Sequence, residues 1–272
     1  MSVEREARLG LEHARRAGNR RHEKELTWWL VWQLPQGPKP VEEAVREWRR
    51  LHDELEGDRA AEAVLLESLA QLEAMRGRLR DARRLAESSM EIRAELGMHV
   101  LRTRGLLILA TVDLAAGDLA AAEGTLRLAR DEAQGGDIET VSNSASLLVD
   151  ILCRQGLLEE ADPISREAEE TAIGDAVVPQ VRWRCARAKL LAQREELDAA
   201  ETVARAAVDI ARNTDDLNLH GTALLSLAEV LAAGDRPEDA HAAAEVALAL
   251  YERKGNIVLA RTAREFLARL SS

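Results

Sequence analysis

The sequence predicts an all-helical protein, a right-handed superhelical solenoid of about six two-helix hairpins with a half-repeat at each end. The 272-residue chain is rich in alanine, leucine, glutamate and arginine, which favour helices, and only 3% of it is aromatic. Runs of β-branched and aromatic residues, which are typical of strands, are missing. A similar segment recurs about every 39 residues, a pattern typical of stacked hairpins that share their buried faces.

The chain begins with half a repeat. Residues 3–17 resemble the second helix of a hairpin, and the first full hairpin begins in the run TWWLVWQL at residues 27–34. Trp28 and Trp32 share one helix face, and Trp29 lies about 100° away, so a single face cannot bury all three. One interpretation is that Trp28 and Trp32 pack in the hairpin core and Trp29 against a neighbouring helix. The other is that the three tryptophans form an interface with an upstream segment or a second copy of the chain.

Each following hairpin repeats the same plan. An alanine lies five residues after the turn, at intervals of 38 to 40 residues. These alanines are Ala44, Ala82, Ala122, Ala161, Ala200 and Ala240. A second small position lies seven residues before the turn. It is filled by Ala70, Ala110, Val149, Ala188 and Ala228. Small side chains at these positions let two helices cross at close range, and apolar residues around them recur at helical spacing.

The turns themselves vary. Three turn positions hold glycine, which favours the left-handed conformation that ends one helix and lets the next fold back. The six positions are Lys39, Gly77, Gly117, Gly156, Glu195 and Asp235. Residues 256–270 resemble the first helix of a hairpin that lacks its second helix, and such a half-repeat is a normal C-terminal cap for an array of this kind. We therefore expect one helical-repeat domain over residues 1–272, and the uncapped start predicts that it is a fragment of a longer protein.

The segments GPKPVEEAVREW, GDRAAEAVLLESLAQLEAMRGRLRDAR, VRWRCARAKLLA, TDDLNLHGTALLSLAEVLAAGDRPEDA and ALALYERKGNIVLA carry a family resemblance. They resemble tetratricopeptide repeats (TPR), and more specifically the helical C-terminal region of bacterial multidomain ATPase signalling proteins. That group includes class III adenylate or guanylate cyclases with an ATPase module and maltose-regulator-like transcription factors. The resemblance covers nearly the whole chain, and LYERKGN is its most specific run. It implies a cytoplasmic regulatory domain, with the ATPase and a catalytic or DNA-binding domain upstream.

The sequence offers no candidate for catalysis. It contains no GxxxxGK[ST], GxGxxG, GxSxG or HExxH motif, and its histidines are scattered, so we expect no enzyme activity, no metal and no cofactor. A net charge of −11 disfavours nucleic acid, and no apolar run is long enough for a membrane span. Cys153 and Cys185 form neither a disulfide framework nor a metal pair, which suits a reducing cytoplasm.

The resemblance also implies where a ligand binds. The positions that face the concave groove in tetratricopeptide repeats are here Arg104, Asn143, Ser146, Asp150, Arg154, Arg182 and Lys189. Equivalent groove-facing positions in the repeats are occupied by Glu67, Gln71, Thr111, Thr222 and Glu229. Four central cations in an acidic chain predict a clamp for a carboxylate or an acidic peptide. The alternative is that these side chains are solvated and line an empty groove.

These observations favour a non-catalytic module that binds a protein, a peptide or a sensed ligand in a bacterial signalling protein. A stand-alone TPR adaptor or scaffold and a homo-oligomerisation domain are the alternatives.

Overall fold

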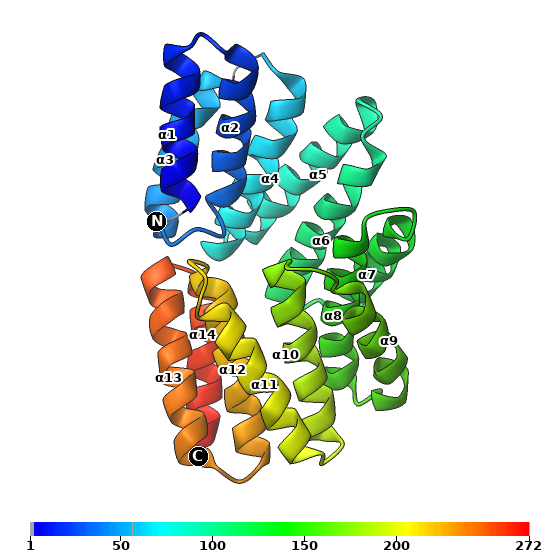
Figure 1. Ribbon diagram of the computed structural model, residues 1–272. Coiled ribbons are helices and arrows are strands. Elements are labelled where there is room, and N and C mark those ends of the chain that lie inside the picture. Colours follow the sequence, from blue (N-terminus) through cyan, green and yellow to red (C-terminus); the bar gives the residue numbers. More distant parts are fainter. Residues whose placement is uncertain (1–2, 56, 272) are drawn as a thin grey trace.

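A computed structural model describes residues 3–55 and 57–271 and confirms the predicted all-helical solenoid (Figure 1). These described residues form fourteen helices and no strand. The helices are α1 (Val3–Arg16), α2 (Arg20–Gln33), α3 (Val41–Glu54), α4 (Arg59–Met75), α5 (Leu79–Glu95), α6 (His99–Ala116), α7 (Leu119–Ala133), α8 (Ile138–Gln155), α9 (Leu158–Thr171), α10 (Val177–Gln193), α11 (Leu197–Ala211), α12 (Leu217–Ala233), α13 (Pro237–Lys254) and α14 (Ile257–Leu270).

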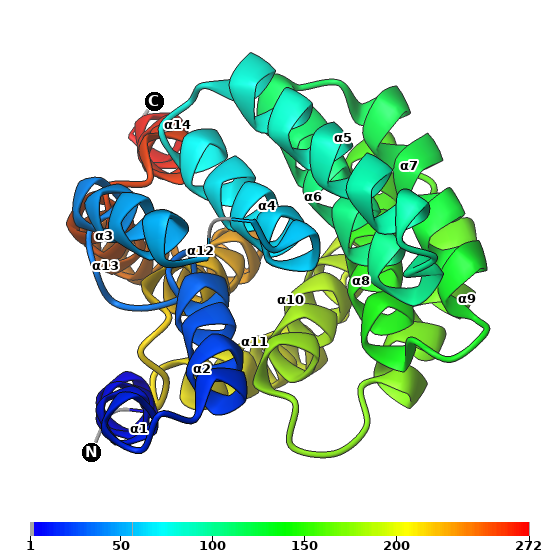
Figure 2. The same ribbon diagram turned by 90° about the horizontal axis from the view of Figure 1, so that it is seen from above.

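The even-numbered helices from α2 to α12 form the inner wall of the superhelix, and the odd-numbered helices lie outside them (Figure 2). Each even-numbered helix packs against the odd-numbered helix that follows it, and successive inner helices also contact one another. Because every hairpin shares a buried face with its neighbours, the core is a continuous layer between the two walls rather than one central cluster.

The small residues lie where the repeat pattern predicts close helix crossings. All six alanines after the turns, from Ala44 to Ala240, are completely buried. The five small residues before the turns, from Ala70 to Ala228, are completely buried as well. A larger side chain at any of these positions would need space that the crossing helices already occupy.

Five of the six hairpin turns use a left-handed residue. Glycine supplies it in three, whereas Glu195 and Asp235 adopt φ values of 63° and 56° although each carries a Cβ atom. Lys39 does not take this role. The last turn of α2 stays right-handed at Leu34, so the chain reverses over the longer loop 34–40. This loop is the main departure from the repeat.

The superhelix completes one turn within the chain. Helices α13 and α14 lie directly below α3 and α4, so the two ends of the array face each other (Figures 1 and 2). Helix α14 contacts α4, and loop 34–40 contacts the end of α13. The inner wall therefore surrounds a central space instead of forming an open arc.

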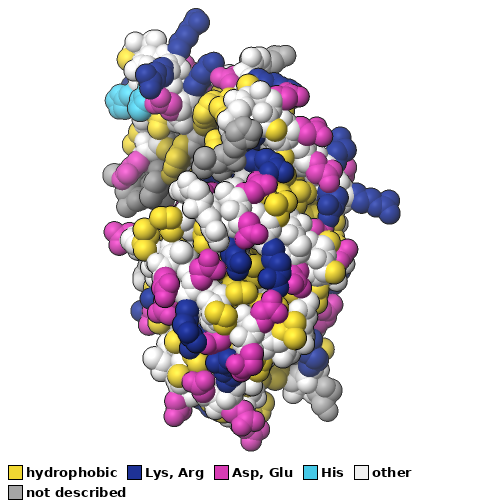
Figure 3. All heavy atoms as spheres, turned by 90° about the vertical axis from the view of Figure 1, so that its right-hand side faces the viewer, with side chains coloured by type: hydrophobic (Ala, Val, Ile, Leu, Met, Phe, Trp, Pro, Cys, Tyr) yellow, Lys and Arg dark blue, Asp and Glu magenta, His cyan; other side chains and the backbone are white. Residues whose placement is uncertain are grey.

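The outer face over α5, α7 and α9 carries basic and acidic side chains interspersed, without a patch of one sign (Figure 3). No helix of the described residues is long and apolar enough to cross a membrane. Cys153 and Cys185 are both buried free thiols, and burial raises the pKa of Cys153 to about 11 and that of Cys185 to about 12.

Candidate ligand-binding groove

A cavity with a volume of about 820 Å³ lies in the upper half of the central space. Its walls come from the inner helices α2, α4, α6, α8 and α10, from loop 34–40, and from the segment that joins α11 to α12. Volumes of about 300–1,000 Å³ are typical of sites for small molecules. We call it the upper cavity.

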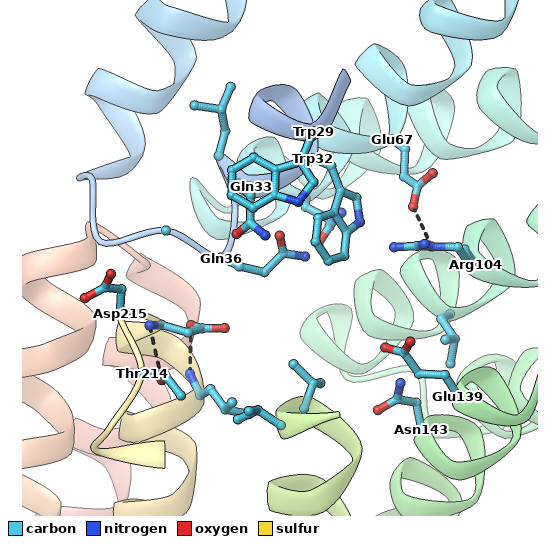
Figure 4. Close-up of a pocket in the computed structure, with 18 of the residues that line it drawn as sticks. Trp29, Trp32, Gln33, Gln36, Glu67, Arg104, Glu139, Asn143, Thr214 and Asp215 are labelled. Carbon is cyan, nitrogen blue, oxygen red and sulfur yellow. Dashed lines mark hydrogen bonds and ion pairs between the residues drawn. The ribbon is translucent and has the colours of Figure 1, made fainter. Parts of the chain in front are cut away.

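Aromatic and amide side chains from α2 and its loop project into the upper cavity. Trp29, Trp32, Gln33 and Gln36 point into it from above (Figure 4). The Nε1 atom of Trp32 and the Oε1 atom of Gln36 are buried, and within the described part of the chain neither has a hydrogen-bond partner. Buried polar atoms normally have a hydrogen-bond partner. Here the Trp32 N–H needs an acceptor and the Gln36 carbonyl oxygen needs a donor, and a ligand could supply both.

Arg104 lies beside this wall and is already engaged. Its guanidinium carbon is 5.2 Å from the centre of the Trp32 ring, and its Nε atom is 3.6 Å from Oε1 of Glu67. Glu67 is buried and also forms an ion pair with the buried Arg93. Glu67 therefore compensates two guanidinium groups, and Arg104 contributes mainly an aromatic–cation surface to the cavity.

Arg182, on α10, differs from every other predicted groove cation. Its Nη1 atom is 3.3 Å from Oδ1 of Asn143, and no carboxylate of the described residues lies within ion-pair distance of it. Burial lowers the pKa of this guanidinium, although Asp216 and Glu139 lie close enough to oppose that shift. A partly buried cation without a direct ion pair is unfavourable, so Arg182 is the position in the groove that most favours an anionic ligand.

A second cavity of about 460 Å³ lies in the lower half, between α8, α10, α12 and α14. Its charges are compensated. Lys189 is 2.7 Å from Asp150 and 3.0 Å from Glu229, and Arg154 is 2.8 Å from Asp150. Burial opposes ionisation of Asp150, but Lys189 and Arg154 outweigh it and hold its pKa below the usual range. The charged side chains among the described residues of this lower cavity are therefore engaged with one another or with neighbours, which disfavours an ionic ligand.

The structure thus divides the predicted groove residues. Arg104, Asn143 and Arg182 line the upper cavity, together with Glu67, Gln71 and Thr111. Asp150, Arg154 and Lys189 line the lower cavity, together with Glu229. Ser146 lines neither cavity, because it is buried and its hydroxyl donates to the carbonyl of Ser142 on its own helix. Thr222 likewise contacts the hydroxyl of Tyr251 instead.

The four predicted cations do not form one cluster, since two belong to each cavity and three of the four are paired. The tryptophans also divide. Trp28 and Trp29 pack against the buried cluster of the first hairpin, whereas Trp32 lies on the cavity wall and not in that core. In the sequence, the wall formed by the α2 side chains and Gln36 was indicated by the run TWWLVWQL alone. Gln36 itself could not be predicted from the repeat, because it lies in a loop that departs from it.

No group of histidine, cysteine or carboxylate side chains among the described residues is arranged to hold a metal ion. A superhelix of two-helix hairpins with ligand-sized cavities on its inner wall defines the class as a TPR-like α-solenoid.

Comparisons with known structures agree with this class. The crystal structure of NprR in complex with its cognate peptide NprX superposes with a TM-score of 0.62 at 13% identity, over 99% of this chain and 72% of that one. The apo form of the quorum sensor NprR from B. thuringiensis gives 0.54 at 12% identity, over 94% and 79%. BtubC (BKLC) from P. vanneervenii gives 0.53 at 22% identity, over 77% and 87%. These similarities show the fold. No protein-family model and no curated protein sequence matches the chain.

Proposed function

We propose that this chain is a non-catalytic peptide- or protein-interaction module that binds its partner in the upper cavity. The observation that carries the proposal is Arg182, a partly buried guanidinium that lines the cavity and has no carboxylate of the described residues within ion-pair distance, although Asp216 and Glu139 lie nearby. The unpaired polar atoms of Trp32 and Gln36 on another wall of the same cavity support it. The structurally similar NprR is known in complex with a peptide, which supports a peptide as the occupant.

The partner we propose carries a carboxylate group, such as an acidic side chain or a free peptide terminus. Guanidinium groups bind carboxylates through two parallel hydrogen bonds, and such charge-assisted bonds are about twice as strong as neutral ones. Trp29 and Trp32 offer apolar area for a neighbouring side chain of the partner.

The test is a library of tetrapeptides with free carboxyl termini, compared with the same library in amidated form, with binding followed by tryptophan fluorescence. We expect the free-carboxyl peptides to bind, and we expect Arg182→Gln to lower their affinity at least about tenfold. The reason is that a charge-assisted hydrogen bond contributes about 1.5–3 kcal/mol. Arg184→Gln is the matched control, since Arg184 lies on the same helix but over the ring of Trp183. Equal binding of both libraries, or no binding at all, contradicts the proposal.

We further propose a signalling context, in which the domain regulates an upstream bacterial ATPase and works in the cytoplasm. The resemblance of the YERKGN-containing segment and the other quoted runs supports this, and the two free buried thiols suit a reducing compartment. A P-loop motif in the coding sequence upstream is the expected finding.

Homodimer formation through Trp28, Trp29 and Trp32 is the second candidate role. It is favoured by one observation, the partly exposed indoles of Trp28 and Trp29 at the N-terminal hairpin. Light scattering of the chain and of Trp29→Ala decides it, because a dimer that becomes a folded monomer identifies the interface.

A further inference from the structure

The two ends of the array meet through a lysine. The Nζ atom of Lys254, the last residue of α13, donates to the carbonyl of Leu34 at 3.2 Å and to that of Gly37 at 2.6 Å. The partners are separated by more than 200 residues in the sequence, and the Lys254 side chain is 0% exposed. We call this contact between loop 34–40 and α13 the seam.

Neighbouring residues extend the seam. The side-chain amide of Asn218, on α12, lies 3.7 Å from the sulfur of Met75 on α4, and Asn256 donates to Asn218 at 3.1 Å. At Gly77 an added Cβ atom would lie 3.1 Å from Cδ1 of Ile257, so the α4–α5 turn lies directly against the start of α14. The seam is therefore a contact along several segments and not a single hydrogen bond.

The run LYERKGN, residues 250–256, contains Lys254 and lies next to the seam. Tyr251 is buried against Gly221, where an added Cβ atom would come within 2.6 Å of the ring. Gly255 ends α13 in the left-handed conformation, and Asn256 caps α14. These residues fix the position of Lys254 at the edge of the array, where it reaches the first hairpin.

The seam combines buried polar contacts with a few apolar ones and, unlike the junctions between successive hairpins, has no shared apolar cluster among the described residues. The buried apolar cluster of the first hairpin and that of the last hairpin are separate, and none of the clusters formed by the described residues spans the seam. Lys254 has two carbonyl partners but no carboxylate of the described residues within ion-pair distance. Burial of this cation is unfavourable and lowers its pKa to about 8. Such a contact can open without exposing a hydrophobic core.

Loop 34–40 belongs to both the seam and the upper cavity. Leu34 and Gly37, which accept from Lys254, also line the cavity beside Gln36. A ligand that reaches from Gln36 and Trp32 to Arg182 would therefore hold the same loop that Lys254 holds.

We propose that Lys254 latches the superhelix into a closed turn, and that ligand binding in the upper cavity and closure of the seam stabilise each other. The second half rests on the function proposed above for that cavity. Because coupling between two sites is reciprocal, the ligand should shift the equilibrium of the seam toward the closed form, and opening of the seam should lower the affinity for the ligand by the same factor. A closed turn also favours a short ligand with a free end over a segment in the middle of a folded partner.

The latch is tested first without any ligand, by amide hydrogen exchange on Lys254→Met. Arg253→Met is the matched control, because Arg253 is the exposed neighbour on the same helix. We expect exchange in segments 34–40 and 76–78 to become at least tenfold faster in Lys254→Met and to stay unchanged in the control. The turn at 156–157, far from the seam, is the internal reference. Unchanged exchange at 34–40 overturns the latch.

The coupling is tested with the tightest-binding tetrapeptide of the library above. We expect this peptide to slow exchange of 34–40 in the wild type and to bind Lys254→Met at least fivefold more weakly than Arg253→Met. Equal affinity for both variants overturns the coupling and leaves the proposed binding function standing. If no tetrapeptide binds the wild type, the proposed function and the coupling both fail, and exchange alone decides the latch.

Discussion

The role of each charged side chain on the inner wall depends on whether it has an ion-pair partner. Arg104, Arg154 and Lys189 lie on inner helices, as Arg182 does, yet each of the three has a carboxylate neighbour. Among the described residues, Arg182 has the amide oxygen of Asn143 as its hydrogen-bond partner and no carboxylate within ion-pair distance. Basic side chains therefore form ion pairs within the wall at three positions, whereas the fourth position favours an anionic ligand.

This difference predicts opposite effects of one substitution at two arginines. Arg182→Met should raise the free energy of unfolding by about 1 kcal/mol, because an uncompensated, partly buried charge is replaced by an apolar chain of similar length. Arg93→Met should lower it by about 3 kcal/mol, because it takes away the buried partner of Glu67. Urea denaturation of both variants measures this, and a destabilised Arg182→Met would show that Arg182 has a structural partner after all.

At the scale of the elements, the turns show how closely each hairpin follows the repeat. The left-handed residue recurs at five turns, and at two of them the chain adopts it without glycine. Residues with a Cβ atom normally avoid a positive φ, but packing of the alanines on both sides of the turn overrides this preference at Glu195 and Asp235. The first hairpin differs, since its seven-residue loop is fixed by contacts with α13 instead of by a tight turn.

Asp235→Gly should therefore stabilise the protein by about 1 kcal/mol, since glycine adopts a positive φ without the steric penalty of a Cβ atom. Asp235 is exposed, so no packing is lost with its side chain. Thermal unfolding gives the result, with Gly156→Ala as the reverse control, expected to lower the melting temperature at the equivalent turn. A lower melting temperature for Asp235→Gly would indicate that its carboxylate stabilises the turn.

The whole molecule is a superhelix whose ends meet, and this closure introduces a pH dependence. Lys254 faces Asp216, which favours its protonated form, and Lys39, which opposes it, but burial is the largest influence. Its pKa falls from 10.5 in the unfolded chain to about 8 in the folded one. The folded state thus binds fewer protons between these values, and stability rises with pH through this window.

We expect the free energy of unfolding of the wild type, relative to Lys254→Met, to increase by up to about 3 kcal/mol between pH 8 and pH 10.5. Below pH 8 the difference should be constant, since Lys254 is then charged in both states. The thiols of Cys153 and Cys185 act in the opposite direction above pH 9, because their pKa values are raised, but they are present in both proteins and cancel. Urea titrations across this range test the prediction, and a pH-independent difference contradicts it.

The helices, their pairing and the points where they cross follow from the amino-acid pattern alone. Alanines such as Ala122 and Ala200 recur at fixed intervals because a repeat buries the same positions in every copy, so local periodicity carries the information. It also placed Arg104, Asn143 and Arg182 on the concave side, since that side follows from the position within each hairpin.

In contrast, the three-dimensional packing of the repeats determines which groove residues share a cavity and which of their charges form ion pairs. Those outcomes depend on contacts between repeats, such as Lys189 with Asp150 one repeat away, and on the pitch that brings Lys254 under loop 34–40. A small rotation per repeat, summed over the whole array, sets that pitch, and no single stretch of sequence encodes it. For this reason the fold was predictable from the residues, whereas the closed turn and its seam were not.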